Sequence, residues 1–166
     1  LAAQDYPNWE CIVVIDGFDA PEAAVEVIRE RLPQAQVVRQ AGAGSGAARN
    51  RGVQHASGAV VAFLDDDDRW PTEMLRQHVA GFADQPEAVA CYGGIRSIAA
   101  NGEVFEETPF WQVDRLGIMR RDVMILNGTI AVRRDAFDAV GGFNPARLRA
   151  QDLDLVLRLA DLGSFV

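Results

Sequence analysis

The chain has 166 residues, of which 49% are hydrophobic and 24% are charged. This composition excludes an intrinsically disordered chain, and the length is that of one ordinary domain, which buries roughly 70% of its unfolded surface. The net charge is −8, and all 16 basic residues are arginines. An acidic chain lacks the basic surface that nucleic-acid binding requires, so this class of partner is excluded.

The cysteines and the apolar runs indicate the cellular compartment of the chain. Cys11 and Cys91 lie in apolar stretches without metal-binding or disulfide spacing, which predicts buried, reduced thiols in a cytosolic protein. The longest apolar run, 59–64, is far shorter than the ~18–20 residues that span a bilayer. The first residues are typical of a helix end and the last of a strand start, so we expect an excerpt of a longer protein.

Strand and helix patterns alternate along the first hundred residues. Short β-rich runs predict strands at 10–15, 37–38 and 59–64, the first typical of a strand buried on both faces. Helices are predicted from Pro21 to Pro33 with Asp19 as N-cap, and from the glycine-rich loop 42–46 to about Ala56. A third helix is predicted after Pro71, and its apolar residues lie on one face: Met74, Leu75, Val79 and Phe82.

The second part of the chain continues this pattern less regularly. Strands are predicted around 88–92 and 128–132, and a short helix at 135–140. The last helix begins near Gln151 and turns inward Leu155, Leu159 and Leu162. Region 106–127 has no clear period, which indicates a mobile loop or an acceptor-facing insertion. Strand–helix alternation predicts an α/β sheet, in which ligands bind at the carboxyl ends of the strands.

Four consecutive aspartates, Asp65 to Asp68, directly follow the predicted strand 59–64. Adjacent carboxylates raise one another's pKa unless a cation lies among them, and Mg²⁺ or Mn²⁺ bridged to phosphate oxygens is a fitting counter-charge. The alternative is a solvated acidic turn that caps the helix after Pro71. Capping accounts for one or two of the four aspartates, so metal binding is favoured.

The sequence resembles family 2 glycosyltransferases through motifs that cover nearly the whole chain. Seven segments recur in the family's order: 6–10 (YPNWE), 13–17 (VVIDG), 48–52 (ARNRG), 63–70 (FLDDDDRW), 132–134 (VRR), 140–143 (VGGF) and 151–159 (QDLDLVLRL). The resemblance implies the GT-A fold, a mixed, mainly parallel sheet flanked by helices. It implies one catalytic domain over 1–166 without its first strand and C-terminal continuation, with a nucleotide-binding half at 1–100 and an acceptor-binding half at 101–166.

The activity that the resemblance implies is inverting transfer of a sugar from a nucleotide-diphosphate donor to an acceptor hydroxyl. By analogy the donor is a UDP-sugar, and the acceptor is a saccharide, a lipid-linked group or a protein. The cofactor is a divalent metal, Mn²⁺ or Mg²⁺. The implied location is the cytoplasm, at the inner face of the membrane, in bacterial cell-envelope polysaccharide synthesis.

The resemblance assigns a role to each matching residue. Asp67 and Asp65 match the Asp-x-Asp motif, with Asp67 on the metal and Asp65 on the ribose or the metal's water shell. Asp66 and Asp68 are neighbours able to exchange these tasks. By the same resemblance Asp16 recognises the nucleobase, and Arg49 lies beside the nucleotide. Asp152 matches the catalytic base, a role that the first turn of a helix supports by favouring the ionised carboxylate.

Two departures from the family pattern leave an alternative open. Ile15 replaces the first of two usual aspartates, and Gln151 replaces a usual glutamate. Both permit a non-catalytic module that binds sugar nucleotides. A phosphatase of the haloacid dehalogenase type is a remoter alternative, because its motif continues with Thr or Val where Arg69 stands.

The other candidate residues are ambiguous from sequence. His55 and His78 are expected to be structural, and the 42–46 loop lacks the lysine of a P-loop. Trp70, Phe110 and Trp111 fit either sugar stacking or core packing.

Overall fold

The computed structural model describes residues 1–17 and 22–166. Within them the strands are β1 (Ile12–Asp16), β2 (Gln36–Gln40), β3 (Val60–Ala62), β4 (Ala90–Tyr92), β5 (Ile95–Ile98), β6 (Val104–Thr108) and β7 (Ile130–Arg133). The helices are α1 (Glu22–Arg31), α2 (Ser45–His55), α3 (Met74–Asp84), α4 (Arg115–Arg120), α5 (Arg134–Ala139), α6 (Gln151–Leu162) and the short 3₁₀ helix η1 (Asn127–Thr129). The predicted N-cap Asp19 lies outside the described residues.

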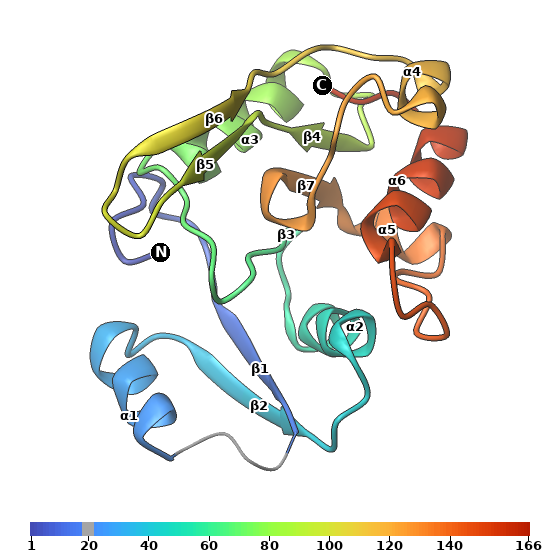
Figure 1. Ribbon diagram of the computed structural model, residues 1–166. Helices are drawn as coiled ribbons and strands as arrows, with labels where there is room; N and C mark the ends of the chain where they lie inside the picture. The colour runs from blue at the N-terminus through green and yellow to red at the C-terminus, as the bar shows by residue number, and fades with distance from the viewer. Residues whose placement is uncertain (18–21) are drawn as a thin grey trace.

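The strand pairings confirm a mixed α/β fold. β1 and β2 are parallel, with Val13 opposite Val37. β7 lies between β3 and β4 and is antiparallel to both, so that Val132 faces Val61 on one side and Ala90 on the other. Figure 1 shows β1, β2 and α1 at one end of the molecule and β4–β6 with α3 at the other. The central strand β7 therefore joins the two predicted halves of the chain in one sheet.

Region 106–127 is not the uninterrupted loop that its sequence predicts. It contains the end of β6, which pairs antiparallel with β5, and the helix α4. The sequence conceals the hairpin because β6 is mostly exposed, so no apolar face produces a strand period. Asp114 caps α4 by accepting a hydrogen bond from the backbone N–H of Gly117 at 2.9 Å.

The core is built on aromatic rings and on the buried face of α6. Phe63, directly after β3, packs edge-on against Phe143 with ring centroids 5.1 Å apart, and Phe137 of α5 lies 5.8 Å from Phe143. From α6, Leu155 and Leu159 are fully buried in the same cluster. This cluster fixes the N-terminal end of α6 beside the end of β3.

Two helices each expose one of the residues that were predicted to face the core. On α3 Val79 is 37% exposed, and His78 is buried in its place at 4%. Burial lowers the pKa of His78 to about 4, so the ring is neutral and packs as an apolar side chain. On α6 Leu162 is 49% exposed, whereas Val156 is buried at 2%. His78 and Val79 are consecutive and therefore lie about 100° apart around α3, so the neighbouring elements decide which of the two is buried.

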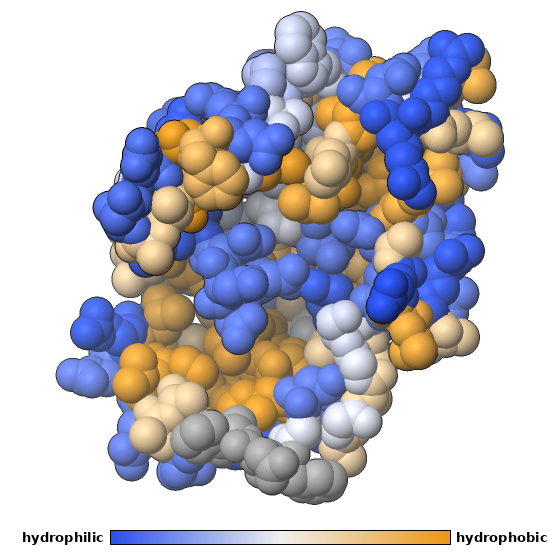
Figure 2. All heavy atoms as spheres, in the orientation of Figure 1, coloured by the Kyte–Doolittle hydropathy of each residue, from blue (hydrophilic) through white to orange (hydrophobic). Residues whose placement is uncertain are grey.

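The first strand is less buried than its composition predicts. Its four apolar residues, 12–15, are all half-buried, and Asp16 is exposed. Within the described residues β1 pairs with β2 alone, so one edge of the strand has no hydrogen-bonded neighbour. Figure 2 shows a hydrophobic surface over this part of the molecule. The described helices include none that is both long and apolar enough to cross a membrane.

The Glu10 carboxylate ties the start of β1 to the loop after α2. One of its oxygens accepts hydrogen bonds from the backbone N–H and hydroxyl of Ser57 at 2.6 and 2.8 Å and from the N–H of Gly58 at 2.8 Å. The Ser57 hydrogen bonds hold the pKa of Glu10 below its ordinary value. The ionised form is therefore favoured by folding.

We predict that Glu10→Gln lowers the thermal midpoint at pH 7 by removing the charged acceptor. A depressed folded-state pKa stabilises the protein above the ordinary pKa of 4.5 and loses that effect as the pH falls through the lower folded value. The difference between variant and wild type should shrink below about pH 4. Thermal unfolding followed by circular dichroism measures it, and Glu30→Gln on exposed α1 is the control. A constant difference from pH 7 to pH 3 would contradict the prediction.

Candidate active site

The glycine-rich loop before α2 is held by Asp16. This carboxylate accepts hydrogen bonds from the Gln40 side chain at 2.8 Å, from the backbone N–H of Ala43 at 2.8 Å and from that of Gly44 at 2.7 Å. These hydrogen bonds lower the pKa of Asp16, and the bond from the Gln40 side chain has the largest effect. The loop amides at the start of α2 therefore bind an anion of the chain itself, and Asp16 shapes the loop beside a pocket lined by Gly17, Arg39, Gln40 and Ala41.

Arg49 lies at the centre of the predicted site. From α2 its Nη2 atom contacts Asp65 Oδ1 at 2.5 Å, and its Nη1 atom donates to Gln151 Oε1 at 3.4 Å. Its side chain is 15% exposed, and the guanidinium lies 5.4 Å from the centre of the Phe143 ring. A largely buried guanidinium needs this carboxylate partner, so Arg49 fixes Asp65 after β3.

Gln151, the first residue of α6, links the two parts of the site. Its Oε1 atom accepts from Ser45 Oγ at 2.8 Å, and its Nε2 atom donates to the Arg147 carbonyl at 2.6 Å. A glutamate here has no N–H to donate to that carbonyl, so glutamine suits the local structure. Gln151 thus joins α2 to α6 through its Oε1 atom, and its Nε2 atom makes a hydrogen bond that the family's usual glutamate could not make.

The remaining aspartates of the cluster are exposed, and Asp65 is 40% exposed in its side chain. Asp68 lies against Gly128, whose added Cβ would stand 2.8 Å from Asp68 Oδ2. Partial burial, followed by the negative charges of Asp67 and Asp65, raises the pKa of Asp68. The three carboxylates therefore share one patch of negative potential at the carboxyl end of β3.

This arrangement suits a divalent cation that phosphate oxygens also bind. Within residues 1–17 and 22–166 no group of three His, Cys, Asp or Glu side chains is placed to bind a metal by itself. Mg²⁺ is characteristically held by one or two carboxylates together with substrate phosphates, and the mutual repulsion in the cluster favours such a cation. The residues therefore fit a metal whose coordination is completed by the phosphate oxygens of a ligand.

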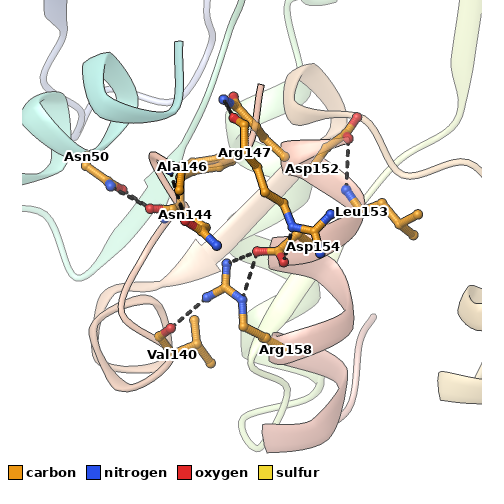
Figure 3. Close-up of polar contacts among 11 residues, drawn as sticks. Asn50, Val140, Asn144, Ala146, Arg147, Asp152, Leu153, Asp154 and Arg158 are labelled. Carbon is orange, nitrogen blue, oxygen red and sulfur yellow. Dashed lines mark hydrogen bonds and ion pairs between the residues drawn. The ribbon is translucent and has the colours of Figure 1, made fainter. Parts of the chain in front are cut away.

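Asp152 lies in the first turn of α6, next to Gln151. Its Oδ1 atom accepts a hydrogen bond from the backbone N–H of Leu153 at 2.8 Å, and the residue is half-buried. The preceding Ala150 has a left-handed conformation with φ of 52°. Figure 3 shows the Asp152 side chain directed away from the arginines around Asp154.

Sequence reasoning missed Asn50, which follows Arg49. Its amide donates to the Phe143 carbonyl at 2.8 Å and accepts from the Phe143 N–H at 2.9 Å, as a neighbouring strand would. Gly142 permits this approach, because its φ is 67° and an added Cβ would stand 2.7 Å from Asn50 Oδ1. Asparagine inside a helix was the available signal, since it is a weak helix former.

The aromatic candidates divide between packing and exposure. Trp70 is half-buried and donates its indole N–H to the Gly128 carbonyl at 2.6 Å, so it packs against η1. Phe110 is 46% exposed and lies 5.0 Å from Tyr92, whose hydroxyl donates to the Trp111 carbonyl. Trp111 itself is 59% exposed and free to contact a ligand.

These features define an α/β domain with an anion-organised loop, an acidic cluster at a strand end and a carboxylate at a helix start. A family profile described as Glycosyl transferase family 2 matches residues 1–141. The chain belongs to this family, which confirms the resemblance and removes the support for a phosphatase.

The curated relatives differ both in the product for which they are named and in length. The O-antigen biosynthesis protein RfbC of Myxococcus xanthus is 29% identical over 100% of this chain and 13% of its own length. The beta-monoglucosyldiacylglycerol synthase of a Synechocystis strain is 32% identical over 96% of this chain and 36% of its own. Amylovoran biosynthesis glycosyltransferase AmsB of Erwinia amylovora is 28% identical over 98% of this chain and 58% of its own length. The chain thus spans 13% to 58% of these relatives.

Solved structures share the fold. TarS 1-349 of S. aureus in complex with UDP has a TM-score of 0.76 at 23% identity, over 99% of this chain and 51% of that one. Mannosyltransferase PcManGT from Pyrobaculum calidifontis, in complex with GDP-Man and Mn2+, has a TM-score of 0.74 at 22% identity, over 99% and 47%. This likeness confirms the predicted GT-A fold.

We predict that Asn50→Ala lowers the free energy of unfolding by about 2–3 kcal/mol, because it leaves two buried backbone groups of Phe143 without partners. Urea unfolding measures the change. Gln54→Ala, an exposed position on the same helix, is the matched control and should change stability by less than about 0.5 kcal/mol. Equal losses in the two variants would show that the amide clamp contributes nothing specific.

Proposed function

We propose that the chain is the catalytic domain of an inverting glycosyltransferase that moves a sugar from a nucleotide-diphosphate donor to an acceptor hydroxyl. The observation that carries the proposal is the contact of Arg49 with both Asp65 and Gln151. Through it the acidic cluster of the 1–100 half, which receives the donor, is joined to the first turn of α6 in the 101–166 half, which receives the acceptor. Asp152 stands in that turn.

The acidic cluster is assigned to the donor diphosphate. Asp67, exposed at the carboxyl end of β3, would hold Mn²⁺ or Mg²⁺ with help from Asp65, and Asp66 would contact the donor. When bound, the metal neutralises the charge that develops on the departing diphosphate. Asp16 keeps the 42–44 loop closed beside the nucleobase, with Gln40 at the same pocket.

Asp152 is assigned as the general base. A carboxylate in the first turn of a helix is stabilised in its ionised form by the helix dipole and by free backbone N–H groups. It accepts one hydrogen bond, from Leu153, through Oδ1, which leaves Oδ2 to take the acceptor's proton. The acceptor oxygen then attacks the anomeric carbon from the face opposite the diphosphate, which inverts the configuration.

The names of the relatives guide the choice of substrates. TarS has been solved with UDP and UDP-GlcNAc, and PcManGT with GDP-Man, so UDP- and GDP-sugars are the donors to test. RfbC and AmsB are named for O-antigen and amylovoran biosynthesis, and the Synechocystis synthase for a glucolipid. A cell-envelope saccharide or lipid-linked acceptor is therefore proposed, used on the cytoplasmic side of the membrane.

We predict that UDP or GDP binds in calorimetric titration only when Mn²⁺ is present, and that Asp67→Ala reduces the affinity at least tenfold. The physical reason is that the cluster's carboxylates repel a diphosphate unless a cation lies between them. Asp84→Asn, exposed at the end of α3, is the control and should bind as the wild type does. Equal binding with and without the metal would exclude the assigned metal role.

We predict that Asp152→Asn lowers kcat by about 100- to 10,000-fold for transfer from the nucleotide sugar that binds. The affinity for the nucleotide should stay unchanged. Amide nitrogen cannot accept the acceptor's proton, although the side chain keeps its shape. Release of the nucleoside diphosphate measures turnover. Metal-dependent binding without any turnover in the wild type would instead identify a non-catalytic sugar-nucleotide module.

A further inference from the structure

The segment between α5 and α6, residues 141–150, carries the chain to the proposed base. It begins with two glycines in left-handed conformations, with φ of 76° at Gly141 and 67° at Gly142. It ends at Ala150, whose left-handed φ of 52° is uncommon for a residue with a side chain. Glycine adopts a positive φ readily, whereas contacts elsewhere must hold Ala150, because a residue with a side chain favours other conformations.

Asp154 supplies those contacts through its two carboxylate oxygens. Oδ1 binds Arg147 Nε at 2.8 Å, and Oδ2 binds Arg158 at 2.6 Å through Nη2 and 3.0 Å through Nε. The Asp154 side chain is 13% exposed, against 53% for Arg147 and 31% for Arg158. The two contacts from Arg158 are charge-assisted hydrogen bonds, which are roughly twice as strong as neutral ones, and the contact from Arg147 is an ion pair.

The two arginines extend the contact along the segment. Arg158 also donates from Nη1 to the carbonyl of Val140, just before the segment, at 2.6 Å. Arg147 lies within the segment, and the backbone N–H of Asp154 donates to the carbonyl of Ala150 at its end at 3.1 Å. The Asp154 side chain therefore contacts the middle of 141–150 through Arg147 and reaches its start through Arg158 (Figure 3), while the helix backbone holds its end.

Asp154 and Asp152 point to different sides of α6. Two residues along a helix correspond to a rotation of about 200°, and Figure 3 shows Asp152 directed away from the arginines. Asp154 is thus separated from any substrate that Asp152 contacts. It can influence the base through the backbone of the first turn.

We propose that Asp154 is a positioning residue, which binds Arg147 and Arg158 together and thereby fixes the segment and helix turn that present Asp152 to the acceptor. The inference rests on the proposed function, because it takes Asp152 as the base. It adds that the orientation of the base depends on a charge cluster outside the site. The carbonyl of Arg147 also accepts a hydrogen bond from the side chain of Gln151, the residue next to Asp152.

The first test measures the segment directly. Hydrogen–deuterium exchange of Asp154→Asn should rise about tenfold or more in 141–154, because one carboxylate no longer holds two cations. The matched control is Asp161→Asn on the same helix, which removes an ion pair with Arg115 of α4 and leaves the segment's contacts intact. Unchanged exchange of the segment in Asp154→Asn would overturn the proposal.

The second test compares turnover with binding. A 1 Å misplacement of a catalytic group costs on the order of 100-fold in rate, so Asp154→Asn should lower kcat by about 10- to 100-fold. The calorimetric affinity for UDP or GDP with Mn²⁺ should stay within about twofold of the wild type. Asp161→Asn should retain both. Wild-type kcat in Asp154→Asn, or equal loss of kcat in the control, would overturn the proposal.

A third variant covers failure of Asp154→Asn to fold. Arg147→Gln removes the more exposed ion pair and leaves that between Asp154 and Arg158, so the core is untouched. It should reproduce the loss of kcat, and Arg147→Lys should partly restore it. Absence of any loss in Arg147→Gln would contradict the proposal. If Asp152→Asn turns over at the wild-type rate, the assignment of the base fails, whereas an inactive Asp152→Asn beside a fully active Asp154→Asn overturns only the positioning role.

Discussion

The ion pair between Arg49 and Asp65 brings α2, the end of β3 and the start of α6 to one point. A guanidinium that is only 15% exposed cannot lie there without a carboxylate, and the Phe143 ring and Gln151 occupy its other sides. Three elements that are distant in sequence must therefore be placed correctly before the charge is satisfied. The acidic cluster and the first turn of α6 take their relative positions from this requirement.

The elements predicted from sequence are those with one apolar face or a short buried run. β2, β3, β7 and α6 follow such patterns, and each is found close to its predicted range. The β5–β6 hairpin was missed because β6 is exposed along most of its length, which leaves no contrast between its faces. His78 was expected to be structural but not to displace Val79 from the core, since helix periodicity alone does not predict that burial keeps the ring neutral.

The candidate site residues stay predictions from motifs, and their contacts could not be predicted from the sequence. Arg49 came from a motif, whereas its partner Gln151 lies about a hundred residues further along the chain. Asp16 illustrates the difference. It was assigned to the donor by resemblance, and in the structure its carboxylate already accepts three hydrogen bonds from Gln40 and the glycine-rich loop. These three hydrogen bonds are visible only once the chain is folded.

The place of β7 has a consequence for how the chain acquires its structure during synthesis. β3 and β4 are synthesised before their partners, because within the described residues both pair with β7, which follows the hairpin and α4, and β4 also bridges to Phe165. Until then two apolar strands have unpaired edges and cannot close the sheet. The nascent chain thus passes through a stage in which these edges can pair with other chains, and rapid completion of the C-terminal third protects it from aggregation.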